Sequence, residues 1–203
     1  MQLRLSGCGR HCGFTLIELM VTVALLAILA VLAVPGFTTW IKNAQIRTAA
    51  EALQGGMRTA QAEALRRNRQ VVMAFTNSAP AAGTTAADNG KNWTLQTVAQ
   101  FGESSEYISG GGIAETNSAV TITGTTTTPA GSVNAVCFNA AGRLAANTSP
   151  GVTSASCAAA ITSFDIDQTN GDRPLRVVLQ LGGQVRMCDP KRVLSATVPD
   201  GCP

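Results

Sequence analysis

The chain has 203 residues, a formal net charge of +3 and a charged fraction of 13%, about half of the roughly 25% usual in soluble proteins. Its single histidine is His11, which lies in a segment that we expect to be removed. A mature chain without histidine excludes Ser/His/Asp and Cys/His catalytic relays and the usual histidine-containing zinc sites. We therefore expect no catalytic residues, no metal and no cofactor, and instead a binding or structural role.

An N-terminal apolar stretch dominates the hydropathy of the chain. Residues 1–13 contain Arg4, Arg10 and no acidic residue, and residues 14–34 contain one charge, Glu18. As a helix rising about 1.5 Å per residue, this stretch would be roughly 32 Å long, close to the ~30 Å core of a bilayer. The basic residues before it predict a cytoplasmic N-terminus.

A cleaved secretory signal peptide is the first alternative. Its apolar region would be shorter and would be followed by a small-x-small cleavage site. Here the apolar run ends at Pro35-Gly36 without such a site, and Gly13 precedes the run instead of following it. The pattern favours a membrane-anchored segment.

The residues around Gly13 resemble a known processing signal. Residues 13–18 read Gly-Phe-Thr-Leu-Ile-Glu and lead directly into the apolar run, which is similar to the class III signature of type IV prepilins. The resemblance implies that a membrane prepilin peptidase cuts between Gly13 and Phe14 and methylates the new amine. The mature chain would run over residues 14–203, and loss of two arginines would leave 13 basic and 12 acidic side chains, a charge of +1.

Glu18 is the one charged residue of the apolar stretch, so its presence there needs a physical explanation. A carboxylate in an apolar helix costs several kcal/mol unless it has a partner, and Glu18 lies about one turn from the new amine of Phe14. One interpretation is a helix-end glutamate that reaches lipid headgroups. The other, which the resemblance implies, is neutralisation by the N-terminal amine of a neighbouring subunit, which sets axial register in a filament.

The helix is expected to continue beyond the apolar run. Pro35 can kink it, but in similar pilins a proline at this spacing does not end the helix, and we assign Pro35 with Glu18 to subunit assembly. From Phe37 the apolar residues recur every three or four positions, which predicts an amphipathic helix packed on a globular domain. We expect one helix over residues 14–67, roughly 80 Å long.

Three arginines follow at the end of this helix. Arg66, Arg67 and Arg69 suit a helix C-terminus, where cations interact favourably with the helix dipole. A nucleic-acid patch is the alternative, but no aromatic residues are interleaved for base stacking. The pattern favours the structural interpretation.

The rest of the chain is predicted to form six to eight mainly antiparallel strands joined by polar loops. Gly182-Gly183 marks a hairpin turn, whereas Gly110-Gly111-Gly112 is expected to be a flexible turn and, without a following Lys-Ser/Thr, no phosphate loop. Residues 125–132 are also expected to be a loop. The strand candidates are residues 70–75, 93–98, 120–123, 133–139, 164–167, 175–181 and 184–188.

Two further motifs extend the resemblance over the whole chain. Residues 136–143, Val-Cys-Phe-Asn-Ala-Ala-Gly-Arg, and the terminal hairpin over residues 177–188 are similar to minor pilins and pseudopilins of the FimT/FimU/GspH group. The resemblance implies an α+β, pilin-like fold, in which a long N-terminal α-helix, transmembrane in its first half, packs on an antiparallel β-sheet or sandwich globular domain. The expected parts are a cleaved leader (1–13), a transmembrane and assembly half of the helix (14–35), an amphipathic half (36–69) and a β-rich periplasmic domain (70–203).

Six cysteines divide between the leader and the globular domain. Cys8 and Cys12 lie in the leader, and we assign them no role. The other four are an even number in an exported domain, which predicts disulfides with three alternative pairings. A zinc site is the rival, but the four lack a C-x-x-C pair. Sequence proximity favours two loops of roughly 15–20 residues, each worth about 3 kcal/mol. The favoured pairs are Cys137–Cys157 and Cys188–Cys202.

The leading functional hypothesis is a minor pilin of a type IV pilus in a two-membrane bacterium, acting in pilus assembly or initiation in a tip complex. The chain would sit in the inner membrane as a single-pass protein with a periplasmic globular domain, and would then join the surface filament. Its partners would be other minor pilins, major pilins, prepilin peptidase and the inner membrane, with no small-molecule substrate.

Two alternatives remain open. FimT-type proteins bind DNA through a C-terminal Gly-Arg-x-Arg loop, and residues 183–186 of this chain read Gly-Gln-Val-Arg, without the first arginine. Arg186, Lys191 and Arg192 nevertheless form a basic cluster that could contact DNA phosphates. The other alternative is an H-type pseudopilin of a type II secretion system, which would have the same architecture.

Overall fold

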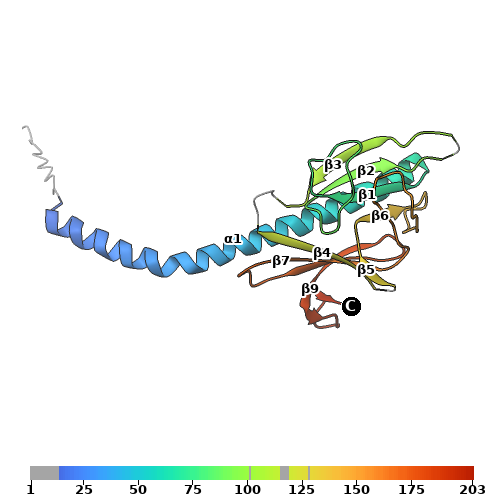
Figure 1. Ribbon diagram of the computed structural model, residues 1–203. Coiled ribbons are helices and arrows are strands. Elements are labelled where there is room, and N and C mark those ends of the chain that lie inside the picture. The colour runs from blue at the N-terminus through green and yellow to red at the C-terminus, as the bar shows by residue number, and fades with distance from the viewer. Residues whose placement is uncertain (1–13, 101, 115–118, 128) are drawn as a thin grey trace, which may run out of the picture. The chain divides into compact units, whose positions relative to one another are not determined.

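The computed structural model describes residues 14–100, 102–114, 119–127 and 129–203 (Figure 1). These residues form one long helix, α1 (Leu16–Arg67), and ten strands. Contacts within the chain divide it into two compact units, Met1–Thr38 and Thr39–Pro203. The apolar part of α1 belongs to the first unit, and the remainder of α1 and all described strands belong to the second.

Local sequence signals explain both ends of α1. The hydroxyl oxygen of Thr15 accepts a hydrogen bond from the backbone N–H of Glu18 (3.3 Å), as an N-cap residue does. At the other end, Arg66 and Arg67 occupy the last turn, and Asn68 follows in the left-handed conformation (φ 49°). The end at Arg67 confirms the predicted boundary, and the start lies two residues after the predicted one.

The strands form two sheets, ordered β3-β2-β1-β6 and β10-β9-β8-β7-β4-β5. Neighbouring strands are antiparallel, apart from the parallel pair β9 and β10. The strands are β1 (Val71–Thr76), β2 (Asn92–Thr97), β3 (Tyr107–Gly112), β4 (Val120–Thr127), β5 (Ala130–Ser132), β6 (Ala135–Phe138), β7 (Thr162–Gln168), β8 (Leu175–Leu179), β9 (Val185–Val193) and β10 (Gly201–Cys202).

The strand prediction was wrong at three places. Gly110-Gly111-Gly112 was expected to be a flexible turn but forms the second half of β3. The reason is close packing, because a Cβ on Gly111 would lie 2.9 Å from the ring of Trp93 on β2. Residues 125–132 contain the end of β4 and all of β5, built from small polar residues without an apolar alternation. β10 has only two residues, too few to produce a sequence pattern.

The core of the second unit lies between α1 and the inner faces of both sheets. Phe75 of β1 and Phe164 of β7 join the sheets directly, with ring centroids 5.1 Å apart. Because apolar residues alternate with polar ones in β4 and β7, each of these strands places one face in the core and the other outside. The helix contributes a face at the predicted spacing of three to four residues, made of Ile46, Ala49, Ala50, Leu53, Met57, Ala60 and Ala64.

Candidate functional site

Phe14, the predicted new N-terminus, and Glu18, one of the two residues predicted to act in subunit assembly, lie around the start of α1. Phe14 precedes the helix and is 79% exposed, and Glu18 is exposed in its first turn. Among the described residues, no cation forms an ion pair with Glu18. The following large apolar side chains are also exposed: Leu16, Ile17, Leu19, Met20, Val21, Val23, Leu25, Leu26, Ile28, Leu29, Val31 and Val34. The helix therefore presents an apolar surface with a single carboxylate near its beginning.

The other predicted residues of this region are described only in part. Gly13 lies outside the described residues, as do Cys8 and Cys12, whereas Pro35 lies within α1. Within the described part of the chain, no single helix has the length and apolar character needed to cross a membrane. The segments Leu16–Val31 and Gly36–Arg67, separated by a bend, meet that requirement only as a pair, by length and composition.

Two of the three cations in the predicted DNA contact are bonded to backbone carbonyls of the chain itself. Arg186 donates from Nη2 to the carbonyl oxygen of Pro199 (2.5 Å). Lys191 donates from Nζ to the carbonyl oxygen of Asp172 (2.8 Å). Arg186 therefore helps to hold the C-terminal segment on β9, and Lys191 joins β9 to the turn between β7 and β8.

The third cation, Arg192, is paired with two carboxylates. Its Nη1 lies 2.8 Å from Oδ2 of Asp200, and its Nε lies 3.7 Å from Oδ2 of Asp189. Two acidic groups thus stand among the three predicted phosphate-binding cations. Contact with DNA phosphates would require these internal bonds to be exchanged, so the geometry favours a structural role for the cluster.

The arginines at the end of α1 also bind acidic partners. Arg67 pairs with Glu63 (2.9 Å) and with Glu106 (2.6 Å), and Arg69 pairs with Glu103 (2.6 Å). Because Glu103 and Glu106 belong to the connection between β2 and β3, these pairs tie the end of the helix to the four-stranded sheet. This arrangement suits the structural interpretation of the basic cluster and leaves little free charge for a nucleic acid.

Among these groups, Glu63 is the one whose pKa the neighbouring arginines change most. Hydrogen bonds from the side chains of Arg66 and then Arg67 lower the pKa of Glu63 from 4.5 to about 2. The same bonds raise the pKa of both arginines. The carboxylate is therefore charged throughout the neutral and mildly acidic range.

The four cysteines of the globular unit form two disulfides, between the pairs that sequence proximity favours. Cys137–Cys157 has a Cα–Cα distance of 5.6 Å, and Cys188–Cys202 has one of 5.1 Å. The first covers the outer face of β1, where Cys137 and Cys157 pack with Val72 and Ala74. The second holds β10 against β9. No group of three or more His, Cys, Asp or Glu side chains that could hold a metal ion occurs in the described ranges.

Two similar turns carry the later sequence motifs. In each, a hydrogen bond closes three residues, from Asn139 N–H to the Arg143 carbonyl and from Gln180 N–H to the Gln184 carbonyl, both 2.9 Å. The third enclosed residue is a left-handed glycine, Gly142 (φ 71°) or Gly183 (φ 86°). This is the geometry of a three-residue hairpin loop with a glycine bulge, in which the positive φ favours glycine.

The two turns meet α1 at a point that we call the turn junction, made of Gln61, Gly142 and Gly183. Gln61 donates from Nε2 to the carbonyl oxygen of Gly142 (2.8 Å). A Cβ on Gly183 would lie 2.0 Å from that same oxygen, so only glycine fits there. Sequence reasoning missed this junction because its members are far apart in the chain. The one sequence feature that could have pointed to it is that both turns have a glycine at their third position.

Comparisons with known proteins agree with the motifs and the fold. Residues 8–34 match the model of the prokaryotic N-terminal methylation motif, and residues 49–183 match the model of the type II transport protein GspH. No curated protein sequence matches the chain significantly.

Solved structures of similar proteins include the type IV minor pilin FimU of Pseudomonas aeruginosa, with 17% identity, 75% of this chain and 97% of that chain covered, and a TM-score of 0.50. The minor pseudopilin EpsH from the type 2 secretion system of Vibrio cholerae has 11% identity, coverage of 73% and 99%, and a TM-score of 0.44. GspH of E. coli has 12% identity, coverage of 72% and 89%, and a TM-score of 0.43. The likeness to FimU confirms the pilin-like α+β fold.

The family match extends over well more than half of the chain, and the methylation motif precedes it in the order that the sequence motifs predict. The chain belongs to the type II transport protein GspH family.

Proposed function

We propose that this chain is a minor pilin that takes part in the assembly or initiation of a type IV pilus, in a tip complex with other minor pilins and the major pilin. Prepilin peptidase cleaves the chain between Gly13 and Phe14 and methylates the new amine. Before assembly, the first part of α1 anchors the chain in the inner membrane, and the globular unit lies in the periplasm. The role is structural, with no catalytic step and no small-molecule substrate.

The observation that carries this proposal is the lone carboxylate of Glu18 on an exposed apolar helix. A single chain in water would leave that surface uncovered, and a single chain in lipid would leave the carboxylate without a partner at a cost of several kcal/mol. A bundle of such helices removes both costs, because a neighbour covers the apolar surface and its Phe14 amine neutralises Glu18. Pro35 has a supporting role, since a proline lets a helix bend to fit such a bundle.

Replacement of Glu18 by glutamine tests the proposal, because it removes the charge and keeps the shape. In a strain that lacks the native gene, the Glu18→Gln chain should reach the membrane at normal levels but enter sheared surface filaments at least tenfold less. Glu51→Gln is the matched control, since Glu51 is an exposed residue of the same helix whose 2.8 Å pair with Arg47 is a surface contact. Its incorporation should be unchanged. Normal incorporation of the Glu18→Gln chain would contradict the proposal.

The assignment to a pilus, as distinct from a type II secretion system, has its own test. Deletion of the gene should reduce surface piliation and twitching motility and should leave the amount of secreted enzymes unchanged. The reverse outcome would assign the chain to secretion. We do not propose DNA binding, because Arg186, Lys191 and Arg192 are bonded within the chain.

A further inference from the structure

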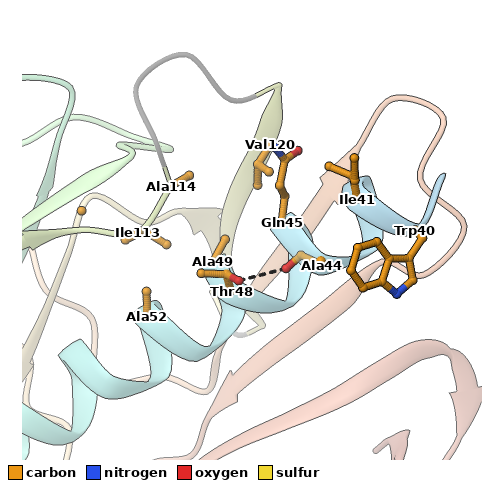
Figure 2. A pocket seen from close by; sticks show the side chains of 11 residues that line it. Trp40, Ile41, Ala44, Gln45, Thr48, Ala49, Ala52, Ile113, Ala114 and Val120 are labelled. Atoms are coloured by element: carbon orange, nitrogen blue, oxygen red, sulfur yellow. Dashed lines mark hydrogen bonds between the residues drawn. The ribbon is translucent and has the colours of Figure 1, made fainter. Parts of the chain in front are cut away.

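Two cavities in the second unit have similar volumes but different chemistry. The first, of about 500 Å³, is lined largely by apolar side chains of α1 and of the segments that carry β3 and β4 (Figure 2). Its Thr48 hydroxyl donates to the carbonyl of Ala44 (3.0 Å), shown as the dashed line in Figure 2. The second cavity, of about 520 Å³, is called the amide pocket here. Its polar lining residues are Asn68, Arg69, Gln70, Gln100, Asn139 and Asn147.

Strand pairing brings the amide pocket together from distant parts of the chain. β1 begins at Val71, which lies opposite Thr97 at the end of β2 and Phe138 at the end of β6. Because both neighbours run antiparallel to β1, the residue before β1 meets the residues that follow β2 and β6 at one end of the four-stranded sheet. The lining residues at these three positions are Gln70, Val98 and Asn139.

Hydrogen bonds within the chain orient three amides of this pocket. Oδ1 of Asn139 accepts from two backbone N–H groups of the turn that follows it (both 3.0 Å). Oδ1 of Asn147 accepts from the backbone N–H of Ser149 (2.9 Å), and its Nδ2 donates to Oε1 of Gln70 (2.9 Å). Because a backbone N–H needs an oxygen acceptor, these bonds fix which atom of each amide is the oxygen.

The same three amides are half-buried and have spare donors. Their oxygen atoms all accept hydrogen bonds within the chain. In contrast, Nε2 of Gln70 and Nδ2 of Asn139 bond to no other group in the described part of the chain. Polar groups that are withdrawn from water need partners. These amides therefore favour a ligand that accepts hydrogen bonds over one that donates them.

Arg69 adds a positive charge to the lining of the pocket. Its Nη1 pairs with Glu103 (2.6 Å), its Nη2 donates to the carbonyl of Val98 (2.8 Å), and its Nε–H is buried without an acceptor among the described residues. A negative charge in the pocket interacts favourably with this guanidinium even without direct contact. Because Glu103 already balances the arginine, a ligand with one negative charge fits better than a phosphate monoester, which carries nearly two.

We propose that the amide pocket binds a single carboxylate group. An ionised carboxylate has only acceptors, so it takes hydrogen bonds from Gln70 and Asn139 and brings no donor of its own. A hydroxyl or amide group would bring donors to amides whose oxygens are already engaged, which costs binding energy. The volume lies in the range usual for small-molecule sites, roughly 300–1,000 Å³, so the carboxylate can carry further atoms. The site does not involve Glu18 and goes beyond the proposed role of the helix.

The test follows side-chain amide NMR signals of the full ¹⁵N-labelled chain in detergent micelles at neutral pH. The probe is acetyl-Ala-Ala with a free C-terminal carboxylate. It should shift the signals of Nε2 of Gln70 and Nδ2 of Asn139 and leave that of Asn134 unchanged, because Nδ2 of Asn134 donates to the Ser154 carbonyl (2.8 Å). The same peptide with an amidated C-terminus should bind at least tenfold more weakly. Propionate separates the sources of the carboxylate, since affinity equal to that of the peptide indicates a free ion and weaker affinity a chain end.

Two variants of nearly unchanged shape locate the binding. Gln70→Glu and Asn139→Asp each replace an NH₂ donor by a carboxylate oxygen and keep the oxygen that accepts the internal bonds, and each should weaken peptide binding at least tenfold. Gln54→Glu is the matched control, because it adds the same charge to a half-buried glutamine of α1 that does not line the pocket; its binding should be unchanged. An unchanged Asn134 signal would show that the variants fold. The proposal fails if the probe shifts neither amide signal, if the amidated peptide binds equally well, or if both pocket variants bind normally.

Discussion

Replacement of Gly183 by alanine probes the turn junction, where the β8–β9 hairpin meets α1. Gly183 has φ 86°, and a Cβ there would lie 2.0 Å from the Gly142 carbonyl oxygen and 2.4 Å from Nε2 of Gln61. Relief of these contacts would require the two turns to separate by more than an ångström. The 2.8 Å hydrogen bond from Gln61 to Gly142 would then be lost or lengthened.

The expected cost follows from two separate effects. The left-handed conformation costs a residue with a Cβ about 1–2 kcal/mol, and a lost hydrogen bond with displaced turns adds about 1–2 kcal/mol. Gly183→Ala should therefore lower the free energy of unfolding by about 2–4 kcal/mol. Gly182→Ala is the matched control, because Gly182 is the adjacent residue and a Cβ there meets no atom within 4 Å. Its effect should stay within about 0.5 kcal/mol.

Urea unfolding of the full chain in detergent micelles, followed by tryptophan fluorescence, measures both variants. The signal is suitable because Trp93 packs against the core of the globular unit. If Gly183→Ala unfolded at the same urea concentration as Gly182→Ala, the close approach of the two turns would not exist in solution. The reasoning about the junction would then be refuted.

Three further predictions concern the ion pairs of Glu63, the disulfide Cys137–Cys157 and DNA binding by the cations near the C-terminus. Glu63→Gln should cost about 1 kcal/mol at pH 7; because the pKa of Glu63 is lowered from 4.5 to about 2, this contribution is present above about pH 4.5 and is lost as the pH falls toward 2. Urea midpoints of the two chains should therefore converge in acid, and a constant difference would contradict the assignment. The double change Cys137→Ser and Cys157→Ser should cost about 3 kcal/mol in guanidinium unfolding, since the disulfide spans 20 residues; a loss under about 1 kcal/mol would count against it. In gel-shift assays at physiological salt the chain should not retain duplex DNA, and retention that Arg186→Gln abolishes would restore the DNA-binding hypothesis.

Much of this fold could be predicted because local chemistry decides it. The end of α1 at Arg67 follows from terminal arginines and a following Asn68, which adopts the left-handed conformation. The two disulfides join cysteines separated by 20 and 14 residues, so sequence proximity was a sufficient guide. Family motifs predicted the fold class, since the methylation motif and the GspH match both lie where the sequence patterns placed them.

The parts that could not be predicted depend on contacts between distant residues. The glycine run of β3 looks like a turn until the ring of Trp93 is seen beside Gly111. Likewise, no local pattern shows that Gln61 bonds to a turn 81 residues later. The cations near the C-terminus show the same difficulty, because the bond from Lys191 to the Asp172 carbonyl connects β9 to the turn between β7 and β8 and makes the Lys191 charge part of the fold.

The central claim is that this chain becomes a filament subunit after processing at its N-terminus. Intact mass and N-terminal peptide analysis of the chain recovered from sheared surface filaments tests this most directly. We predict a chain that begins at Phe14 with a methylated amine, present in filaments and dependent on prepilin peptidase. Recovery of the chain only from membranes, with residues 1–13 still attached, would contradict the account.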